Sequence, residues 1–208
     1  GVCAPKGFKA SGVHCGIRKN KTKKDLALIV ADNMCSAAAV YTTNKVYGAP
    51  ITVTREHLQN GKAQVVICNS GNANTCNADG VEKAKMMADL VEKHTGISSS
   101  DVIVASTGVI GQVLPIEPIA DGMQQLADEL SYNGSDDAAT AIMTTDTVKK
   151  EFAVEFELDG KKVTIGAIAK GSGMIHPNMA TLLCFVTTDV NISPAMLDKA
   201  LKTVVVDT

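Results

Sequence analysis

Two segments of alternating apolar and polar residues, 152–158 and 163–167, constrain the fold more than any other feature of the sequence. Such alternation is typical of β-strands, because successive side chains point to opposite faces of a sheet. Asp159 and Gly160 lie between the segments, and this dipeptide favours a type I′ turn. The sequence therefore predicts an antiparallel β-hairpin whose second strand leads directly to Lys170 and a glycine-containing segment.

Strands and helices are mixed along the rest of the chain. Short apolar runs predict further strands at 26–31, 35–42, 64–68, 102–105 and 182–186. Apolar residues at helical spacing predict helices at about 80–95, 116–130, 136–143 and 194–206. This pattern, with an antiparallel hairpin, predicts an α/β or α+β fold. A doubly wound dinucleotide fold is not expected, since no G-x-G-x-x-G motif follows a strand.

Composition excludes several classes of function. The net charge of the 208 residues is −2 and aromatic residues make up 3%, so neither a basic stripe nor stacking side chains are available for nucleic acid. No apolar run approaches the roughly 20 residues that span a bilayer. The six cysteines lack C-x-x-C spacing, which favours free thiols over disulfides or a metal site. We expect no metal, no membrane contact and a cytoplasmic location.

Three clusters combine small residues with hydroxyl or amide groups: 69–74, 106–108 and 170–181. Each is also compatible with an ordinary turn, because glycine and asparagine tolerate positive φ. Phosphate binding by the third cluster is disfavoured, since it lacks the G-x-x-x-x-G-K-[ST] order and Pro177 stands where a helix would begin. His176 precedes that proline and is a poor candidate for a general base.

A different chemistry is open to Thr181, which starts a predicted strand after the small Ala180 and an irregular turn. Its hydroxyl could attack the carbonyl of Ala180, and an N-to-O acyl shift followed by hydrolysis would release Thr181 as a new amino terminus. The α-amine, with an ordinary pKa of about 7.7–8.0, could then act as the base for the hydroxyl.

Residues 170–183 resemble the signature of the ornithine acetyltransferase family, also called glutamate N-acetyltransferases, of arginine biosynthesis. Other segments resemble the family in the same order and extend the likeness over nearly the whole chain: Ala4-Pro-Lys-Gly-Phe8, Thr42-Thr-Asn44, Asn69-Ser-Gly-Asn-Ala-Asn74, Ser106-Thr-Gly-Val-Ile-Gly111 and Met143-Thr-Thr-Asp-Thr147.

The resemblance implies a role for each matching residue. Thr181 corresponds to the nucleophile, freed by self-cleavage of the Ala180–Thr181 bond. Thr107 and Gly108 correspond to the oxyanion hole, through a hydroxyl and a backbone N–H. Thr147 and Lys170 correspond to substrate-contacting positions, as does Thr181. The implied fold is a layered αββα sandwich similar to N-terminal-nucleophile peptidases of the DmpA type.

The implied reaction is a ping-pong transfer of acetyl from N-acetylornithine to Thr181 and then to glutamate. No cofactor is expected, although some members of the family also accept acetyl-coenzyme A as donor. Residues 1–180 would form the alpha chain and 181–208 the start of a beta chain, whose remainder is an expected partner in an oligomer of both chains. Two alternatives stay open: a related N-terminal-nucleophile amidohydrolase or aminopeptidase, and a non-catalytic amino-acid-binding module.

Overall fold

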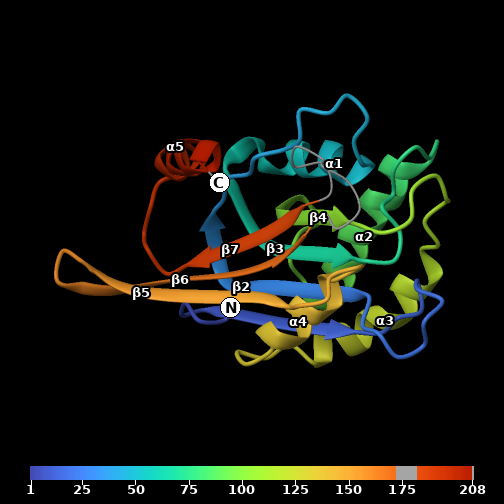
Figure 1. Ribbon diagram of the computed structural model, residues 1–208, viewed down its shortest axis with the longest axis horizontal. Helices are drawn as coiled ribbons and strands as arrows, with labels where there is room; N and C mark the ends of the chain where they lie inside the picture. Colours follow the sequence, from blue (N-terminus) through green and yellow to red (C-terminus); the bar gives the residue numbers. More distant parts are fainter. Residues whose placement is uncertain (172–181, 208) are drawn as a thin grey trace.

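The computed structural model of the chain describes residues 1–171 and 182–207 (Figure 1). The strands are β1 (Phe8–Val13), β2 (Leu26–Ser36), β3 (Lys62–Asn69), β4 (Val102–Ser106), β5 (Lys150–Leu158), β6 (Lys161–Lys170) and β7 (Leu183–Thr188). The α-helices are α1 (Ala49–His57), α2 (Gly80–Thr95), α3 (Glu117–Asp128), α4 (Ser135–Ile142) and α5 (Pro194–Val204). Short 3-10 helices occupy Leu58–Asn60, Ser99–Asp101 and Val205–Asp207.

The strands form two sheets. In the first sheet the order is β1-β2-β3-β4, with β1, β2 and β3 antiparallel and β4 parallel to β3. The connection from β3 to β4 runs through α2, as a parallel pair requires. In the second sheet, β5, β6 and β7 are antiparallel in that order.

Alternate residues of the first sheet enter two separate cores, which is why its strands read as continuous apolar runs. One core lies between the sheet and the helices α1, α2 and α3, and includes Leu26, Leu28, Ile67, Val104, Met87 and Met123. The other lies between the sheet, α4 and the second sheet, and includes Ala27, Ile29, Cys68, Ile142 and Ile168. The two sheets therefore lie face to face, with helices outside the first (Figure 1).

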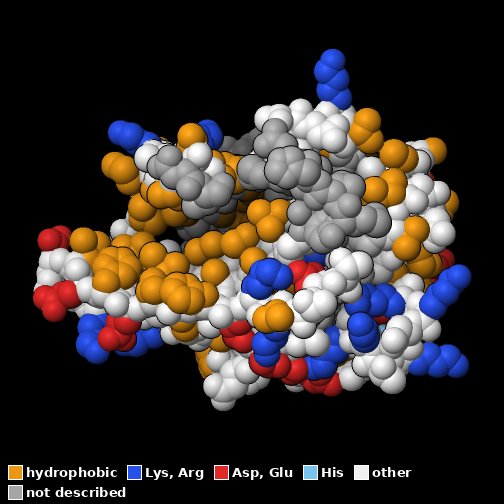
Figure 2. Space-filling model, viewed as in Figure 1, with side chains coloured by type: hydrophobic (Ala, Val, Ile, Leu, Met, Phe, Trp, Pro, Cys, Tyr) orange, Lys and Arg blue, Asp and Glu red, His pale blue; other side chains and the backbone are white. Residues whose placement is uncertain are grey.

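The outer face of the second sheet carries no helix in the part of the chain that the structure describes. Its exposed apolar side chains belong to β5 and β7, and are Phe152, Val154, Phe156, Leu158 and Val186. Hydrophobic side chains gather over this region in Figure 2. We call these five residues the outer apolar face.

The mixed α/β architecture with two sheets agrees with the sequence prediction, and so do the four predicted helices. The hairpin is confirmed: Asp159 and Gly160 have φ values of 49° and 71°, the two positive angles of a type I′ turn. Gly96 ends α2 with a φ of 74°.

One predicted boundary is wrong. The sequence predicts two separate strands, 26–31 and 35–42, with Asp32 in the turn between them, but β2 is continuous from Leu26 to Ser36. Asp32 stays within the strand because its N–H donates to the Gly7 carbonyl at 2.8 Å, while its carboxylate accepts the Tyr132 hydroxyl. A register shift after Val30 absorbs the irregularity, and residues 37–44 lie outside any strand. The sequence analysis also missed β1 and α1.

All six cysteines are free thiols, as predicted. Among the described residues, no helix combines the length and apolarity needed to cross a bilayer. Within the same residues, no group of three or more His, Cys, Asp or Glu side chains is arranged to hold a metal ion.

Candidate active site

The parallel strands β3 and β4 end side by side, with Asn69 paired to Ser106. Because parallel strands deliver their following loops to the same edge, clusters 69–74 and 106–108 meet there. The Asn69 amide nitrogen donates to the Ser106 hydroxyl at 2.7 Å, and the Asn69 carbonyl accepts the Thr107 N–H at 2.9 Å. Two of the three clusters singled out from the sequence therefore form one unit.

The asparagines of the first cluster shape its loop. The Asn69 side-chain oxygen accepts the N–H groups of Gly71 and Asn72, at 3.2 and 3.0 Å. The Asn72 oxygen accepts the Asn74 N–H at 2.7 Å, and its amide nitrogen donates to the carbonyl of Gln112. These side chains replace backbone partners in a tight turn, so their role is structural.

The second cluster packs directly on that loop. Gly108 has a φ of 129°, and a Cβ there would lie 2.5 Å from the Gly71 carbonyl carbon. The Val109 N–H donates to the Gly71 carbonyl, and the Ala73 N–H donates to the Val109 carbonyl at 2.8 Å. Only glycine fits at position 108, because the approach is close and the φ is positive.

Two hydrogen-bond donors at this edge are not used by the described residues. Within 1–171 and 182–207, neither the Thr107 hydroxyl nor the Gly108 N–H has a hydrogen-bond partner, whereas the backbone N–H groups of Thr107 and Val109 do. Thr107 is 7% exposed and Gly108 is exposed. A fixed hydroxyl and N–H, both unengaged, are suited to stabilise an oxyanion.

Lys170, at the end of β6, reaches the same edge from the second sheet. It is 3% exposed, and it interacts electrostatically with Cys68 near the end of β3. Burial lowers the pKa of its ammonium group, and the nearby charge of Asp146 opposes that shift. The positive charges of Lys150 and Arg18 lower the pKa of Lys170 further.

Asp146 joins Lys170 to the loop that contains Thr147. Its carboxylate accepts the Gly171 N–H at 2.8 Å, the Thr144 N–H at 3.3 Å and the Lys150 ammonium at 2.8 Å. Burial alone would raise the pKa of Asp146, but these three donors outweigh burial and lower the pKa to about 2. The carboxylate is thus ionised at neutral pH.

The structure therefore brings Thr107, Gly108 and Lys170 to one edge of the two facing sheets, with exposed Thr147 linked through Asp146. Ala180 and Thr181 lie outside the described residues. The sequence analysis missed Asp146, although a carboxylate between two threonines and four residues before a lysine was a signal for a charged link.

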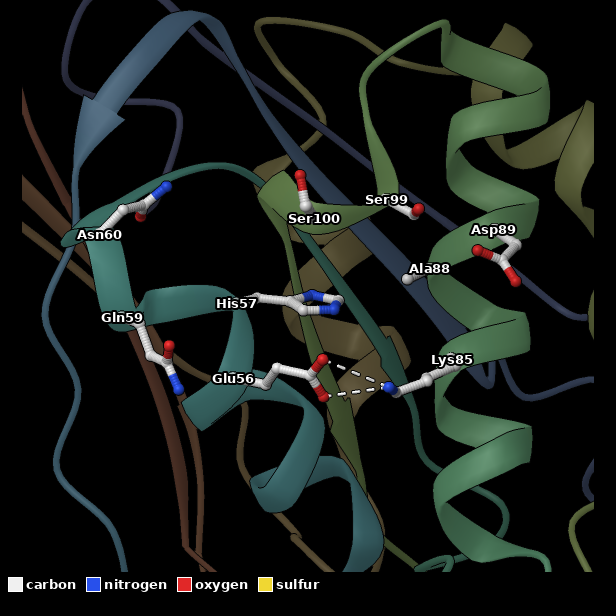
Figure 3. A pocket seen from close by; sticks show the side chains of 9 residues that line it. All are labelled: Glu56, His57, Gln59, Asn60, Lys85, Ala88, Asp89, Ser99 and Ser100. Carbon is white, nitrogen blue, oxygen red and sulfur yellow. Dashed lines mark hydrogen bonds and ion pairs between the residues drawn. The ribbon is translucent and has the colours of Figure 1, made fainter.

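Two surface hollows lie away from this edge. The first lies between α1 and α2, where the Glu56 carboxylate pairs with the Lys85 ammonium at 3.0 Å (Figure 3). The second lies between residues 37–47 and α5. Neither hollow is lined by the predicted site residues. The edge formed by β3 and β4 therefore remains the candidate site.

The sequence model of the ArgJ family matches residues 9–208. The chain belongs to the ArgJ family. It is 51% identical over 202 residues to the arginine biosynthesis bifunctional protein ArgJ of Caldanaerobacter subterraneus, covering 97% of this chain and 50% of that protein. It is 49% identical to the ArgJ protein of Geobacillus kaustophilus, with the same 50% share of the relative. The chain thus spans about half the length of the curated ArgJ relatives it matches.

Solved structures agree with this assignment. ArgJ from Bacillus halodurans superposes with a TM-score of 0.78 at 44% identity, over 86% of this chain and 94% of that one. Ornithine acetyltransferase from Mycobacterium tuberculosis, solved with ornithine, gives 0.75 at 35% identity, over 88% and 96%. The L-aminopeptidase D-Ala-esterase/amidase of Ochrobactrum anthropi, described as a variant of the Ntn hydrolase fold, gives 0.56 at 14% identity, over 95% and 65%, which shows a shared fold alone.

Proposed function

We propose that the full-length protein moves an acetyl group from N-acetylornithine to glutamate through an acyl-enzyme on Thr181. The observation that carries the proposal is the pair of unengaged donors on Thr107 and Gly108, beside the buried ammonium of Lys170. ArgJ relatives named as bifunctional arginine-biosynthesis proteins, and an ornithine-bound acetyltransferase of the same fold, support it.

In the proposed first half-reaction, the Thr181 hydroxyl oxygen attacks the acetyl carbonyl carbon of N-acetylornithine. The Thr181 α-amine accepts the hydroxyl proton and returns it to the departing nitrogen, so that ornithine leaves as a neutral amine. Thr107 and Gly108 stabilise the negative oxygen of the tetrahedral intermediate. The second half-reaction is the reverse, with the amine of glutamate attacking the Thr181 acetyl ester.

Thr181 must first become an amino terminus. We propose that its hydroxyl attacks the carbonyl carbon of Ala180, that the peptide nitrogen leaves as the new α-amine, and that water hydrolyses the resulting ester. This divides the protein into an alpha chain, 1–180, and a beta chain that starts at 181. The same two donors, Thr107 and Gly108, serve the oxyanion of this step.

Substrate binding is assigned to Thr147 and Lys170. An ammonium is a suitable partner for an amino-acid carboxylate, and burial strengthens such a pair because water competes less. Asp146 accepts the backbone N–H groups of Gly171, which follows Lys170, and of Thr144, in the loop that contains Thr147. We propose no bound cofactor; acetyl-coenzyme A would serve as a second acetyl donor to Thr181.

We further propose that the remainder of the beta chain, other than residues 181–208, covers the outer apolar face. Exposed apolar patches of this kind mark protein contacts, and the curated relatives are about twice as long as this chain. The functional unit would be an oligomer of alpha and beta chains. Free thiols at all six cysteines support a reducing, cytoplasmic location.

The test is an intact-mass and acetyl-transfer measurement on full-length protein beside Thr181→Ala. Wild type should split before Thr181 and transfer labelled acetyl from N-acetylornithine to glutamate, and the variant should do neither. Labelled acetyl-coenzyme A in place of N-acetylornithine tests the second donor. Intact wild type with full transfer would contradict the mechanism.

A related amidohydrolase or aminopeptidase is the second candidate, because the aminopeptidase of Ochrobactrum anthropi shares the fold. Omitting glutamate separates the two. A hydrolase would release acetate at an unchanged rate, whereas a transferase would stop after one acetyl per site. A non-catalytic amino-acid-binding module would show ligand-induced melting shifts without either product, and Thr181→Ala would leave those shifts unchanged.

A further inference from the structure

A buried carboxylate outside the proposed chemistry organises the loop before β2. Asp25 is fully buried and accepts the N–H of Cys15 at 2.7 Å, that of Gly16 at 3.3 Å and that of Arg18 at 3.0 Å. The His14 ring lies 3.4 Å from the same carboxylate. Asp25 therefore fixes the backbone from which the Arg18 side chain extends.

The Arg18 guanidinium contacts two segments that are far apart in sequence. Its Nε donates to the Ser70 carbonyl at 3.0 Å, and its Nη2 donates to the Ser70 hydroxyl at 2.5 Å and to the Met143 carbonyl. The Ser70 hydroxyl in turn donates to the carbonyl of Ala141, and the Ser70 N–H donates to the Asp25 carbonyl at 2.9 Å. Ser70 is thus held from three sides.

These contacts join the two halves of the candidate site. Ser70 precedes Gly71, on which Gly108 packs, so Ser70 is connected to Gly108 through a single residue. Met143 follows α4 and begins the loop that carries Asp146 and Thr147. One guanidinium therefore contacts both the residue that precedes Gly71 and the residue that begins the 144–147 loop.

We propose that Arg18 is a positioning residue that aligns the Thr107–Gly108 oxyanion donors with the 144–147 substrate loop. The proposal rests on the proposed acetyl transfer. A planar guanidinium can hold both Ser70 and the Met143 carbonyl at once, and its charge suits the negative end of α4. Lysine would keep the positive charge but lose the planar arrangement of N–H donors with which the guanidinium contacts both segments.

The test uses full-length, self-cleaved protein carrying Arg18→Lys or Arg18→Ala, with Arg55→Ala as the matched control. Arg55 is the other arginine of the sequence; it lies on α1 and stacks on Tyr41 and Tyr47, which precede that helix, rather than on a residue of the candidate site. Because displacement of about 1 Å can cost about 100-fold in rate, we expect kcat to fall about 100-fold in both Arg18 variants. KM should change less than kcat, and Arg55→Ala should remain within about twofold of wild type.

Two readouts separate positioning from general loss of structure. The burst of acetyl-enzyme, counted per cleaved chain, should keep its amplitude while its rate falls, and methylguanidine should restore part of the rate of Arg18→Ala. Hydrogen exchange should rise at 69–74 and 143–147 but not in α2. If Arg18→Ala does not fold, Arg18→Lys and Ser70→Ala carry the same test.

Unchanged kcat and unchanged exchange in the Arg18 variants would overturn the proposal, and so would a loss of burst amplitude without a change in rate. If wild type transfers no acetyl at all while hydrogen exchange still rises at 69–74 and 143–147 in the Arg18 variants, the positioning role of Arg18 stands and the acetyltransferase assignment fails. The two failures are therefore distinguishable.

Discussion

The edge formed by β3 and β4 and the outer apolar face differ in what the described residues leave unsatisfied. At the edge, asparagine side chains and backbone carbonyls hold the loops, and the open groups are two precise donors, Thr107 and Gly108. On the outer apolar face, Phe152 and Val186 are 65% and 58% exposed. Under the proposed function, the first region stabilises a small charged intermediate and the second forms an interface with more protein.

The largest expected effect comes from Gly108→Ala. Its Cβ would collide with the Gly71 backbone at 2.5 Å, so either the loop or the donor must move. We expect acetyl transfer to fall at least about 1,000-fold, since losing one oxyanion donor costs about 100- to 1,000-fold. Gly111→Ala is the control, because Gly111 also has positive φ, 76°, but open space around it. Gly111→Ala should lower the unfolding free energy by only about 1 kcal/mol. An equal loss of acetyl transfer in both variants would contradict a specific role of Gly108 at this edge.

A smaller effect is expected from Thr107→Val, which removes the hydroxyl while keeping the shape of the side chain. The hydroxyl has no partner among the described residues, so stability should change by less than about 0.5 kcal/mol. Acetyl transfer and the rate of self-cleavage should both fall about 100-fold. Steady-state kinetics and a time course of intact mass measure the two rates. A change in stability without a change in either rate would show that the hydroxyl is structural.

Local patterns made some of these features predictable from the sequence. The hairpin and its turn followed from alternation and the Asp159-Gly160 pair, and α2 from apolar residues at helical spacing. The strand β1 could not be recognised, because Phe8-Lys-Ala-Ser-Gly-Val13 is held mainly by its pairing with β2. Tertiary hydrogen bonds at Asp32 likewise overrode the local preference for a turn.

The candidate site was predictable only in part for the same reason. Residues 69–74 and 106–108 could be recognised as clusters, yet their contact depends on the parallel pairing of β3 and β4. Arg18 begins a run of mostly charged residues, 18–24, that is typical of a solvated loop, and only the fold places it against Ser70 and Met143. Contacts between residues far apart in the sequence cannot be recognised from the spacing of neighbouring residues.

The link through Asp146 gives a pH-dependent prediction. Its pKa is about 2 in the folded protein and about 3.9 in an unfolded chain, so the ionised carboxylate stabilises the fold above about pH 4. That contribution is lost as the pH falls from about 4 to about 2. The difference in unfolding free energy between wild type and Asp146→Asn should therefore be smaller at pH 3 than at pH 6, measured by urea unfolding. If the difference in unfolding free energy between wild type and Asp146→Asn grows toward pH 3, the ionised Asp146 carboxylate does not stabilise the fold.

The smallest expected effect concerns the outer apolar face. Phe152→Ser should change the unfolding free energy of the 208-residue chain by less than about 0.5 kcal/mol, because the side chain is already largely exposed. Ile168→Ala, on the buried face of the same sheet, should cost about 2–5 kcal/mol and serves as the contrast. With the proposed remainder of the beta chain added, Phe152→Ser should weaken association measurably, because a contact that buries the phenyl ring adds hydrophobic stabilisation that the 208-residue chain lacks. If Phe152→Ser leaves association unchanged, the outer apolar face does not form an interface with the remainder of the beta chain.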